Sequence, residues 1–239
     1  MNYFFITGSS KGLGKALTEL LLKDDNNTVY GFARNSSITH NNYHHTTIDF
    51  NDLNAVQNYA FPHLENIEKL VLINNAGLVG DVKHVGKIDS KQIALCYNVN
   101  LVAPAIITNH FIAAYNKHPQ EKLIINISSG AGRSAIDGWS TYCSAKSGID
   151  MFSRVLNEEI KIDNSNIKVL SLAPGIIDTD MQKEIRAADQ NNFSNIEKFI
   201  DYKKEGDLAT PEATASLVNQ IIETPDLLND VLCSVRDIN

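Results

Sequence analysis

Cysteine is scarce in this chain of 239 residues, which has only Cys96, Cys143 and Cys233 and no C-x-x-C pair. This scarcity excludes a disulfide framework and is typical of proteins in a reducing cytosol. We therefore expect a cytoplasmic protein.

Positive charge and long apolar runs are also lacking. The 21 Lys and Arg residues are outnumbered by 28 Asp and Glu and are scattered, so we expect no nucleic-acid partner. No apolar run approaches the roughly 18 residues of a membrane span. The N-terminus lacks a basic region and a cleavage site, so neither a membrane anchor nor a signal peptide is expected. The seven histidines show no metal-ligand spacing, and no metal site is predicted.

Short β-rich segments alternate with helical patterns along the chain, which is typical of a parallel sheet covered by helices. The expected strands are Tyr3–Thr7, Thr28–Ala33, His45–Ile48, Lys69–Ile73, Lys122–Ile127, Ile167–Leu172 and Asp230–Val235. The expected helices are Leu13–Leu22, Leu53–Tyr59, Lys91–Tyr97, Leu101–Asn116, Thr141–Ile160 and Pro211–Glu223. We predict an α/β fold, with residues 1–239 forming a single Rossmann-like domain. Its doubly wound parallel sheet should have about seven strands and helices on both faces.

Two of these helices are apolar on more than one side. Residues 101–116 are apolar nearly all round, and residues 141–160 carry apolar side chains on several faces. One side can pack on the sheet, and the other predicts a homodimer or homotetramer interface. Burial within one thick domain is the alternative.

A glycine-rich turn, Thr7–Gly14, follows the first strand and opens directly into a helix. Glycines at such a place allow the backbone to approach a pyrophosphate at a helix N-terminus. The spacing differs from G-x-G-x-x-G, and its position after the first strand is what supports a dinucleotide site.

The end of the second strand predicts which dinucleotide binds. An NAD site usually places an acid there, whereas this chain has Arg34 and Asn35. Arg34 and Lys11 offer two cations to a 2′-phosphate, which indicates NADPH/NADP as cofactor. The alternative is that both are solvated loop cations.

Tyr142 and Lys146 stand four positions apart, which places both side chains on one face of a helix. A neighbouring ammonium favours phenolate, so we expect Lys146 to lower the pKa of Tyr142 and make it a proton donor and acceptor.

In this company the sequence resembles the short-chain dehydrogenase/reductase family. The matching motifs are T-G-x-x-x-G-x-G at Thr7–Gly14, N-N-A-G at Asn74–Gly77, Asn100, Ser129, Y-x-x-x-K at Tyr142–Lys146, and P-G-x-x-x-T at Pro174–Thr179. The likeness covers essentially the whole chain and implies an NADP-dependent oxidoreductase that acts on a small-molecule carbonyl.

The resemblance implies the roles of individual residues. The implied catalytic residues are Asn100, Ser129, Tyr142 and Lys146. The implied cofactor-binding residues are Gly8, Ser10, Lys11, Gly12, Leu13, Gly14, Arg34, Asn35, Asp49, Phe50, Asn75, Ala76, Gly77, Tyr142, Lys146, Pro174, Gly175, Ile177 and Thr179. The candidate substrate contacts are Ser129, Trp139, Gly175 and Met181, beneath a lid expected at about 180–205.

The blocks Gly138–Cys143 and Ala173–Gln182 look like those of sepiapterin reductases and of the bacterial reductases that convert benzil to (S)-benzoin. They imply reduction of a ketone, such as one carbonyl of a 1,2-diketone. Pterin reduction is the alternative, for which Asp237 is the one plausible counterpart of the pterin-binding acid. A non-catalytic NADP-binding regulator is the alternative of another class.

Overall fold

The strands of this protein form one parallel sheet. The computed structural model describes residues 1–238, and in them seven strands lie in the order β3-β2-β1-β4-β5-β6-β7. They are β1 (Asn2–Thr7), β2 (Asn27–Ala33), β3 (Tyr43–Thr47), β4 (Lys69–Asn74), β5 (Lys122–Ile127), β6 (Ile167–Ala173) and β7 (Leu232–Ser234). The direction in which successive strands are added reverses between β1 and β4, and these two strands pair in parallel. The predicted doubly wound α/β fold is confirmed.

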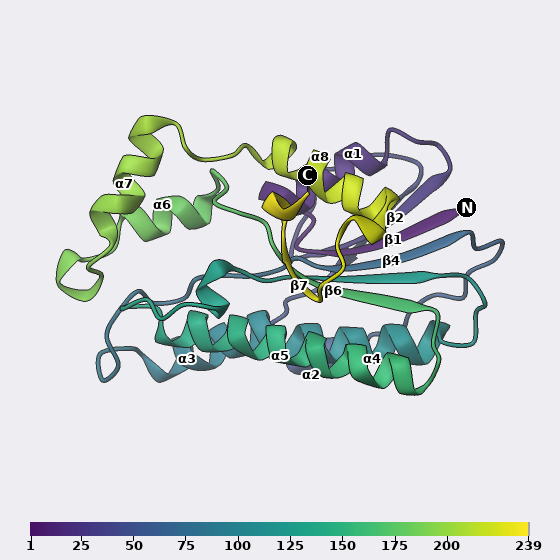
Figure 1. Ribbon diagram of the computed structural model, residues 1–239, viewed down its shortest axis with the longest axis horizontal. Coiled ribbons are helices and arrows are strands. Elements are labelled where there is room, and N and C mark those ends of the chain that lie inside the picture. The colour runs from purple at the N-terminus through teal and green to yellow at the C-terminus, as the bar shows by residue number, and fades with distance from the viewer. Residues whose placement is uncertain (239) are drawn as a thin grey trace.

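Helices cover both faces of the sheet (Figure 1). One face carries α1 (Gly12–Leu21) and α8 (Pro211–Glu223). The other carries α2 (Leu53–Gln57), α3 (Ser90–Tyr97), α4 (Ala103–Tyr115) and α5 (Ser140–Ile162). Strand β5 is buried from end to end and β4 is buried from Leu70 to Asn74, as expected for central strands covered on both faces. Within residues 1–238, no helix has the combined length and apolarity needed to cross a membrane.

The segment from 180 to 205 is helical, which the sequence analysis did not predict. It contains α6 (Asp180–Arg186) and α7 (Ile196–Glu205), and α7 ends at Gly206 in the left-handed conformation. Figure 1 shows both helices beyond the carboxyl ends of the strands, at the left of the view. They therefore lie at the edge where a doubly wound sheet binds its ligands.

Strands β3 and β7 differ from the prediction by more than one residue at their starts. Strand β3 begins at Tyr43 rather than His45, because its ladder with β2 pairs Val29 with Tyr43. Strand β7 has only three residues because it is the sheet edge and pairs only with Ser171–Ala173 of β6.

A wide helical turn joins α3 to α4. Residues Asn98–Val102 form a π-helical turn, called η1, in which the Ala103 amide donates to the Asn98 carbonyl five residues earlier. Such turns insert one extra residue into a helix and are frequent at functional sites. Asn100 lies in the middle of this turn.

The outer surface of α5 carries exposed apolar side chains. Met151 is 53% exposed and Val155 is 49% exposed. The inner side of the same helix is buried against the sheet through Leu156 and Ile160. Helix α5 therefore presents an apolar face that the described chain does not cover.

Candidate functional site

The loops after β1 and β4 meet where the sheet reverses its winding. The Asn75 side chain donates to the carbonyl oxygens of Thr7 at 3.0 Å and Gly8 at 3.2 Å. The Thr7 hydroxyl accepts from the backbone amides of Asn75 at 2.9 Å and Ala76 at 3.0 Å. The structure thus brings the T-G-x-x-x-G-x-G and N-N-A-G motifs together in one crevice.

The glycine turn leaves the N-terminus of α1 open. A Cβ placed on Gly14 would collide with the carbonyl oxygen of Gly8, so only glycine allows the turn and helix to lie this close. Among the described residues, no side chain caps this N-terminus, and its first turn carries no acid. Residues Ser10, Lys11, Gly12 and Leu13 enclose free backbone N–H groups there. This geometry fits the pyrophosphate of a dinucleotide.

Arg34 and Asn35 directly follow β2, and both are exposed. The backbone amide of Gly8 donates to the Phe32 carbonyl at 2.8 Å, which holds the glycine turn against this end of β2. Arg34 and the turn that contains Lys11 therefore border the same region. The Lys11 ammonium also lies 3.6 Å from the Asp180 carboxylate at the start of α6, a contact that the sequence analysis did not predict.

Asp49 and Phe50 lie just beyond β3, on the side of the crevice away from Tyr142. The Asp49 carboxylate is exposed and accepts from the backbone amide of Asn51 at 2.9 Å. Phe50 is buried in the core beside Phe32. Phe50 is thus a packing residue, whereas Asp49 remains accessible to a ligand.

Ser129, Tyr142 and Lys146 converge at the carboxyl end of β5. Ser129 precedes η2 (Gly130–Gly132), and its hydroxyl accepts from the Ala131 amide at 3.1 Å. Tyr142 and Lys146 lie on consecutive turns of α5 and are 6% and 4% exposed. The Lys146 ammonium donates to the Ile127 carbonyl at 2.8 Å, which fixes the end of the lysine side chain beside β5.

Asn100 completes this cluster from η1. Its side-chain amide donates to the carbonyl oxygens of Leu78 and Cys96, each at 2.9 Å, and its oxygen accepts from the Leu78 amide at 3.2 Å. A Cβ on Gly77 would lie 3.0 Å from that oxygen and 3.6 Å from the Lys146 nitrogen. Asn100 and Lys146 therefore border the same small volume.

The pKa values of this cluster differ from the expectation. Burial raises the pKa of Tyr142 to about 12, and a hydrogen bond with the Ser129 hydroxyl offsets only part of the rise. Burial also lowers the pKa of Lys146 to about 8. The expectation that Lys146 lowers the pKa of Tyr142 is wrong for this chain, because removal of both groups from water outweighs their attraction. Tyr142 therefore holds its proton at neutral pH.

The segment Pro174–Thr179 runs from β6 past the glycine turn. A Cβ on Gly12 would lie 3.2 Å from the Thr179 methyl group, so the two segments are in contact. Ile177 packs on the core beneath α1 and bridges to Ala209. Pro174 and Gly175 lie between this contact and the end of β6.

Trp139 connects Tyr142 to the segment 180–205. Its ring stacks on Phe193 at 5.3 Å between centroids and meets the Tyr142 ring edge-on at 5.5 Å. Met181 packs on the same apolar cluster, in which Trp139 and Phe193 are buried. Phe193 was not among the candidate residues, although it is one of two phenylalanines in the segment 180–205. Its burial shows that the segment is docked on the polar cluster.

Asp137 holds the same segment through polar contacts. Its carboxylate accepts from the Ser194 amide and hydroxyl, each at 2.7 Å, and these bonds lower the pKa of Asp137. No sequence motif singles out this residue. These hydrogen bonds between Asp137 and Ser194 lie next to the apolar contact of Trp139 with Phe193.

Asp237 has a local structural role. Its carboxylate accepts from the Ser234 amide at 2.7 Å and caps η5 (Val235–Asp237). Residues 1–238 contain no cluster of three or more His, Cys, Asp or Glu side chains that could hold a metal ion.

Solved structures share this fold. A short chain dehydrogenase/reductase from Saccharomyces cerevisiae superposes with a TM-score of 0.83 at 24% identity, covering 98% of this chain and 96% of the other. A 4-hydroxyisoleucine dehydrogenase complexed with NADH gives a TM-score of 0.79 at 20% identity, again covering 98% and 96%. At these identities the comparison establishes the fold.

Sequence relatives extend over the same range. The chain is 34% identical over 241 residues to the benzil reductase ((S)-benzoin forming) of Bacillus cereus, covering 95% of this chain and 96% of the relative. It is 32% identical over 160 residues to the sepiapterin reductase of Xenopus tropicalis, covering 65% of this chain and 59% of the relative. A family model described as short chain dehydrogenase matches residues 2–190. The chain therefore belongs to the short-chain dehydrogenase/reductase family and is an oxidoreductase.

Proposed function

We propose that this protein is an NADPH-dependent carbonyl reductase that uses Tyr142 as the proton donor. The observation that carries the proposal is the buried Tyr142, which has the Ser129 hydroxyl and the Lys146 ammonium as neighbours. Reduction of a ketone builds negative charge on oxygen and consumes one proton. A neutral phenol beside a second hydroxyl meets both requirements.

Each polar residue of the cluster has a separate task. NADPH, when bound, supplies the hydride. The Ser129 hydroxyl orients the carbonyl oxygen, and the Tyr142 hydroxyl gives that oxygen its proton. Lys146 stabilises the phenolate that remains, and it also binds the nicotinamide ribose. Asn100 lies beside Lys146 and forms part of the path by which Tyr142 regains its proton from solvent.

The preference for NADPH rests on Arg34 and Lys11. Both are exposed cations at the edge where β2 ends, and the described chain places no acid at position 34 or 35. A planar guanidinium suits the oxygens of a 2′-phosphate. The rest of the proposed dinucleotide site is lined by Asn35, Asp49, the backbone of Phe50, Ala76, Gly77, Gly175 and Thr179.

The proposed substrate is a 1,2-diketone such as benzil. Two relatives that align over nearly the full chain bear the name benzil reductase ((S)-benzoin forming), one from Bacillus cereus and one from Bacillus subtilis. The buried indole N–H of Trp139 has no partner within residues 1–238. An unpaired buried donor is costly, and the second carbonyl oxygen of a diketone would accept from it.

Pterin reduction is the second candidate, and it rests on the sepiapterin reductases among the relatives. Its acid counterpart, Asp237, is occupied as the cap of its own turn. A non-catalytic NADP-binding regulator is a third reading, which the complete set of Asn100, Ser129, Tyr142 and Lys146 disfavours.

We further propose that each chain forms one domain, with residues 180–205 as a lid. The protein is proposed to be a homo-oligomer in the cytoplasm. The apolar outer face of α5 supports the interface, because Met151 and Val155 would be buried in it. Contacts of the segment with Trp139 and Asp137 support the lid.

A panel of benzil, other diketones, sepiapterin, quinones and simple aldehydes, assayed with NADPH and with NADH, tests the proposal. Diketones should oxidise NADPH much faster than NADH, with one product enantiomer in excess. Equal rates with both nucleotides would contradict the roles of Arg34 and Lys11. A pterin preference would replace the diketone assignment, and failure to reduce any carbonyl would refute the function.

A further inference from the structure

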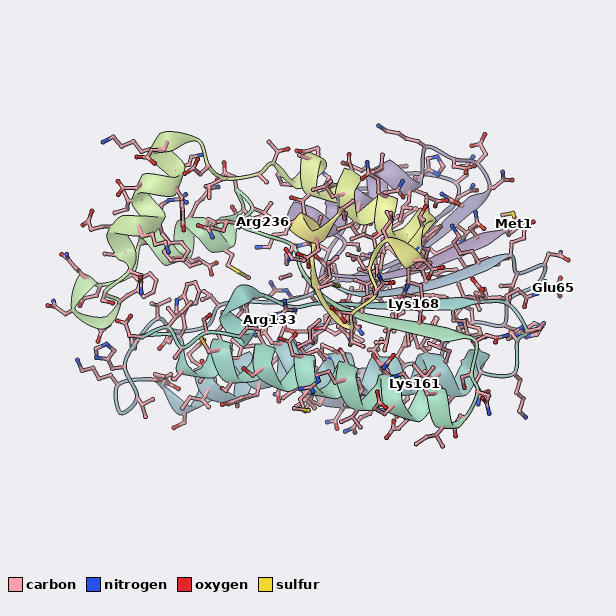
Figure 2. The ribbon with its side chains drawn as sticks, in the orientation of Figure 1. Met1, Glu65, Arg133, Lys161, Lys168 and Arg236 are labelled. Carbon is pink, nitrogen blue, oxygen red and sulfur yellow. The ribbon has the colours of Figure 1, made fainter. Side chains whose placement is uncertain are left out.

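An ion pair between the partly exposed Arg133 and the buried Asp150 joins the segments that carry Ser129 and Lys146. Arg133 Nε lies 3.2 Å from Asp150 Oδ2, and Asp150 is 4% exposed. Arg133 directly follows η2, the turn that Ser129 begins, and Asp150 lies one helical turn after Lys146 on α5. Figure 2 shows Arg133 between η2 and the C-terminal segment that contains β7. The pair therefore spans both halves of the proposed catalytic cluster.

The rest of the pair's hydrogen bonds reach two strands. Asp150 Oδ1 accepts from the Ser171 hydroxyl at 2.6 Å. Arg133 Nη2 donates to the backbone carbonyls of Ser171 at 3.2 Å and Cys233 at 3.3 Å. Because the guanidinium is planar and both carboxylate oxygens are engaged, the arrangement permits little movement. It fixes η2, α5, β6 and β7 relative to one another.

The backbone of η2 rests directly on the helical turn of Lys146. A Cβ on Gly132 would lie 2.9 Å from both the carbonyl carbon and the carbonyl oxygen of Lys146. The Ser147 hydroxyl donates to the Gly132 carbonyl at 2.6 Å. With no side chain between η2 and α5, a shift of Arg133 relative to Asp150 moves Ser129 relative to Tyr142.

We propose that the Arg133–Asp150 ion pair positions Ser129 and Lys146 for carbonyl reduction. Arg133 and Asp150 are then positioning residues, and the inference rests on the function proposed above. The Asp150 carboxylate also favours the charged form of Lys146, against the burial that lowers its pKa. The other titratable groups around Lys146 are Cys96 on α3 and Tyr142 on α5, with Arg133 beyond Asp150.

The test compares Arg133→Met, Arg133→Lys and Asp150→Asn with the unaltered protein, using benzil and NADPH. A displacement of about 1 Å in a catalytic group costs on the order of 100-fold, so we expect kcat to fall about 10- to 100-fold in Arg133→Met and Asp150→Asn. The KM for NADPH should stay within about twofold. Arg133→Lys should restore part of kcat, and Asp150→Asn should move the alkaline limb of the pH–rate profile to lower pH.

Ser153→Ala is the matched control for stability. Ser153 is buried on the same helix, donates to the Ile149 carbonyl at 2.8 Å and accepts from Asn126 at 2.9 Å, away from η2. If kcat falls in proportion to thermal stability across all four variants, Ser153→Ala included, the pair is merely structural and the proposal is overturned. Unchanged kcat in Arg133→Met and Asp150→Asn would overturn it as well.

A second measurement is independent of turnover. Lysine carrying ¹³C at Cε reports the titration of Lys146 by NMR, and Lys146→Met assigns its signal. Asp150→Asn should lower the pKa of Lys146, whereas an unchanged titration would overturn the proposal. If the unaltered protein reduces no carbonyl, the proposed function fails while this titration still decides the inference.

Discussion

The Lys146 ammonium lies 5.8 Å from the centroid of the Tyr142 ring, and both side chains are more than nine-tenths buried. Burial favours the neutral form of each group, so it raises the pKa of Tyr142 and lowers that of Lys146. At neutral pH the phenol carries its proton. A protonated phenol is the form that can donate a proton, as the carbonyl reduction proposed above requires.

Tyr142→Phe should remove most of kcat. General-acid catalysis contributes about 10²- to 10⁴-fold, and phenylalanine keeps the ring but lacks the hydroxyl. NADPH binding, followed by the change in nucleotide fluorescence, should remain near normal, as should the melting temperature.

Tyr97→Phe is the control for Tyr142→Phe. The Tyr97 hydroxyl forms a hydrogen bond of 2.7 Å with the hydroxyl of Ser144, which lies on the same helix as Tyr142. It should leave kcat unchanged. Loss of NADPH binding in Tyr142→Phe would instead show that Tyr142 has a structural role.

Lys146 should make stability depend on alkaline pH. Its pKa of about 8 in the folded chain is below the ordinary 10.5, so between these pH values the unfolded chain binds more protons. The free energy of unfolding of the native protein should therefore rise with pH in this window relative to Lys146→Met. At about 1.4 kcal/mol per pKa unit, the relative gain is on the order of 3 kcal/mol.

Urea unfolding at several pH values from 7 to about 11 measures this difference. Tyr142 contributes the opposite trend above its ordinary pKa of 10.0, in both proteins, and so does not enter the comparison. Lys161→Met, which removes an exposed lysine, should show no such window. A difference that is constant across the pH range would contradict the lowered pKa.

Arg34→Ala should weaken the binding of NADPH but not of NADH. A charge-assisted hydrogen bond contributes about 1.5–3 kcal/mol, which corresponds to roughly 10- to 100-fold in Kd. Isothermal titration with both nucleotides measures the change. Lys15→Ala, on the first turn of the neighbouring α1, is the control and should alter neither affinity. Equal weakening for NADH would show that Arg34 does not contact the 2′-phosphate.

Phe193→Ala should loosen residues 180–205. Phe193 is fully buried against Trp139, and truncation of such a ring costs about 3–5 kcal/mol. We expect faster proteolysis within this segment and a higher KM for the ketone, with NADPH affinity retained. Ile200→Ala, on the partly exposed side of α7, is the control. A ketone KM that does not change would separate the segment from the substrate site.

The positions of the strands along the chain and the placement of the motifs could be predicted from the sequence, because both depend on local patterns. Apolar runs such as Leu70–Ile73 and Leu123–Ile125 identify buried parallel strands. The cap Thr210 and the first-turn Pro211 identify the start of α8, and the Thr210 hydroxyl indeed accepts from the Ala213 amide.

Other features depended on tertiary contacts. Helices α6 and α7 are short and largely polar. Their few apolar side chains become buried only by packing against Trp139 and Phe193. The available sequence signal for α7 was the helical spacing of Ile196, Phe199 and Ile200, followed by Gly206 as a helix terminator. The pKa of Tyr142 was mispredicted because sequence spacing indicates which groups are neighbours but not how far both are removed from water.

The π-helical turn at Asn98–Val102 makes the length of this segment as important as its composition. A π turn holds one residue more than an α turn, so deletion of one residue here would close the turn into regular helix and remove the bulge that carries Asn100. The Asn100 side chain would then be displaced from the carbonyl oxygens of Leu78 and Cys96, to which it donates. No position of this turn is exposed, so a one-residue insertion or deletion would also displace packed side chains.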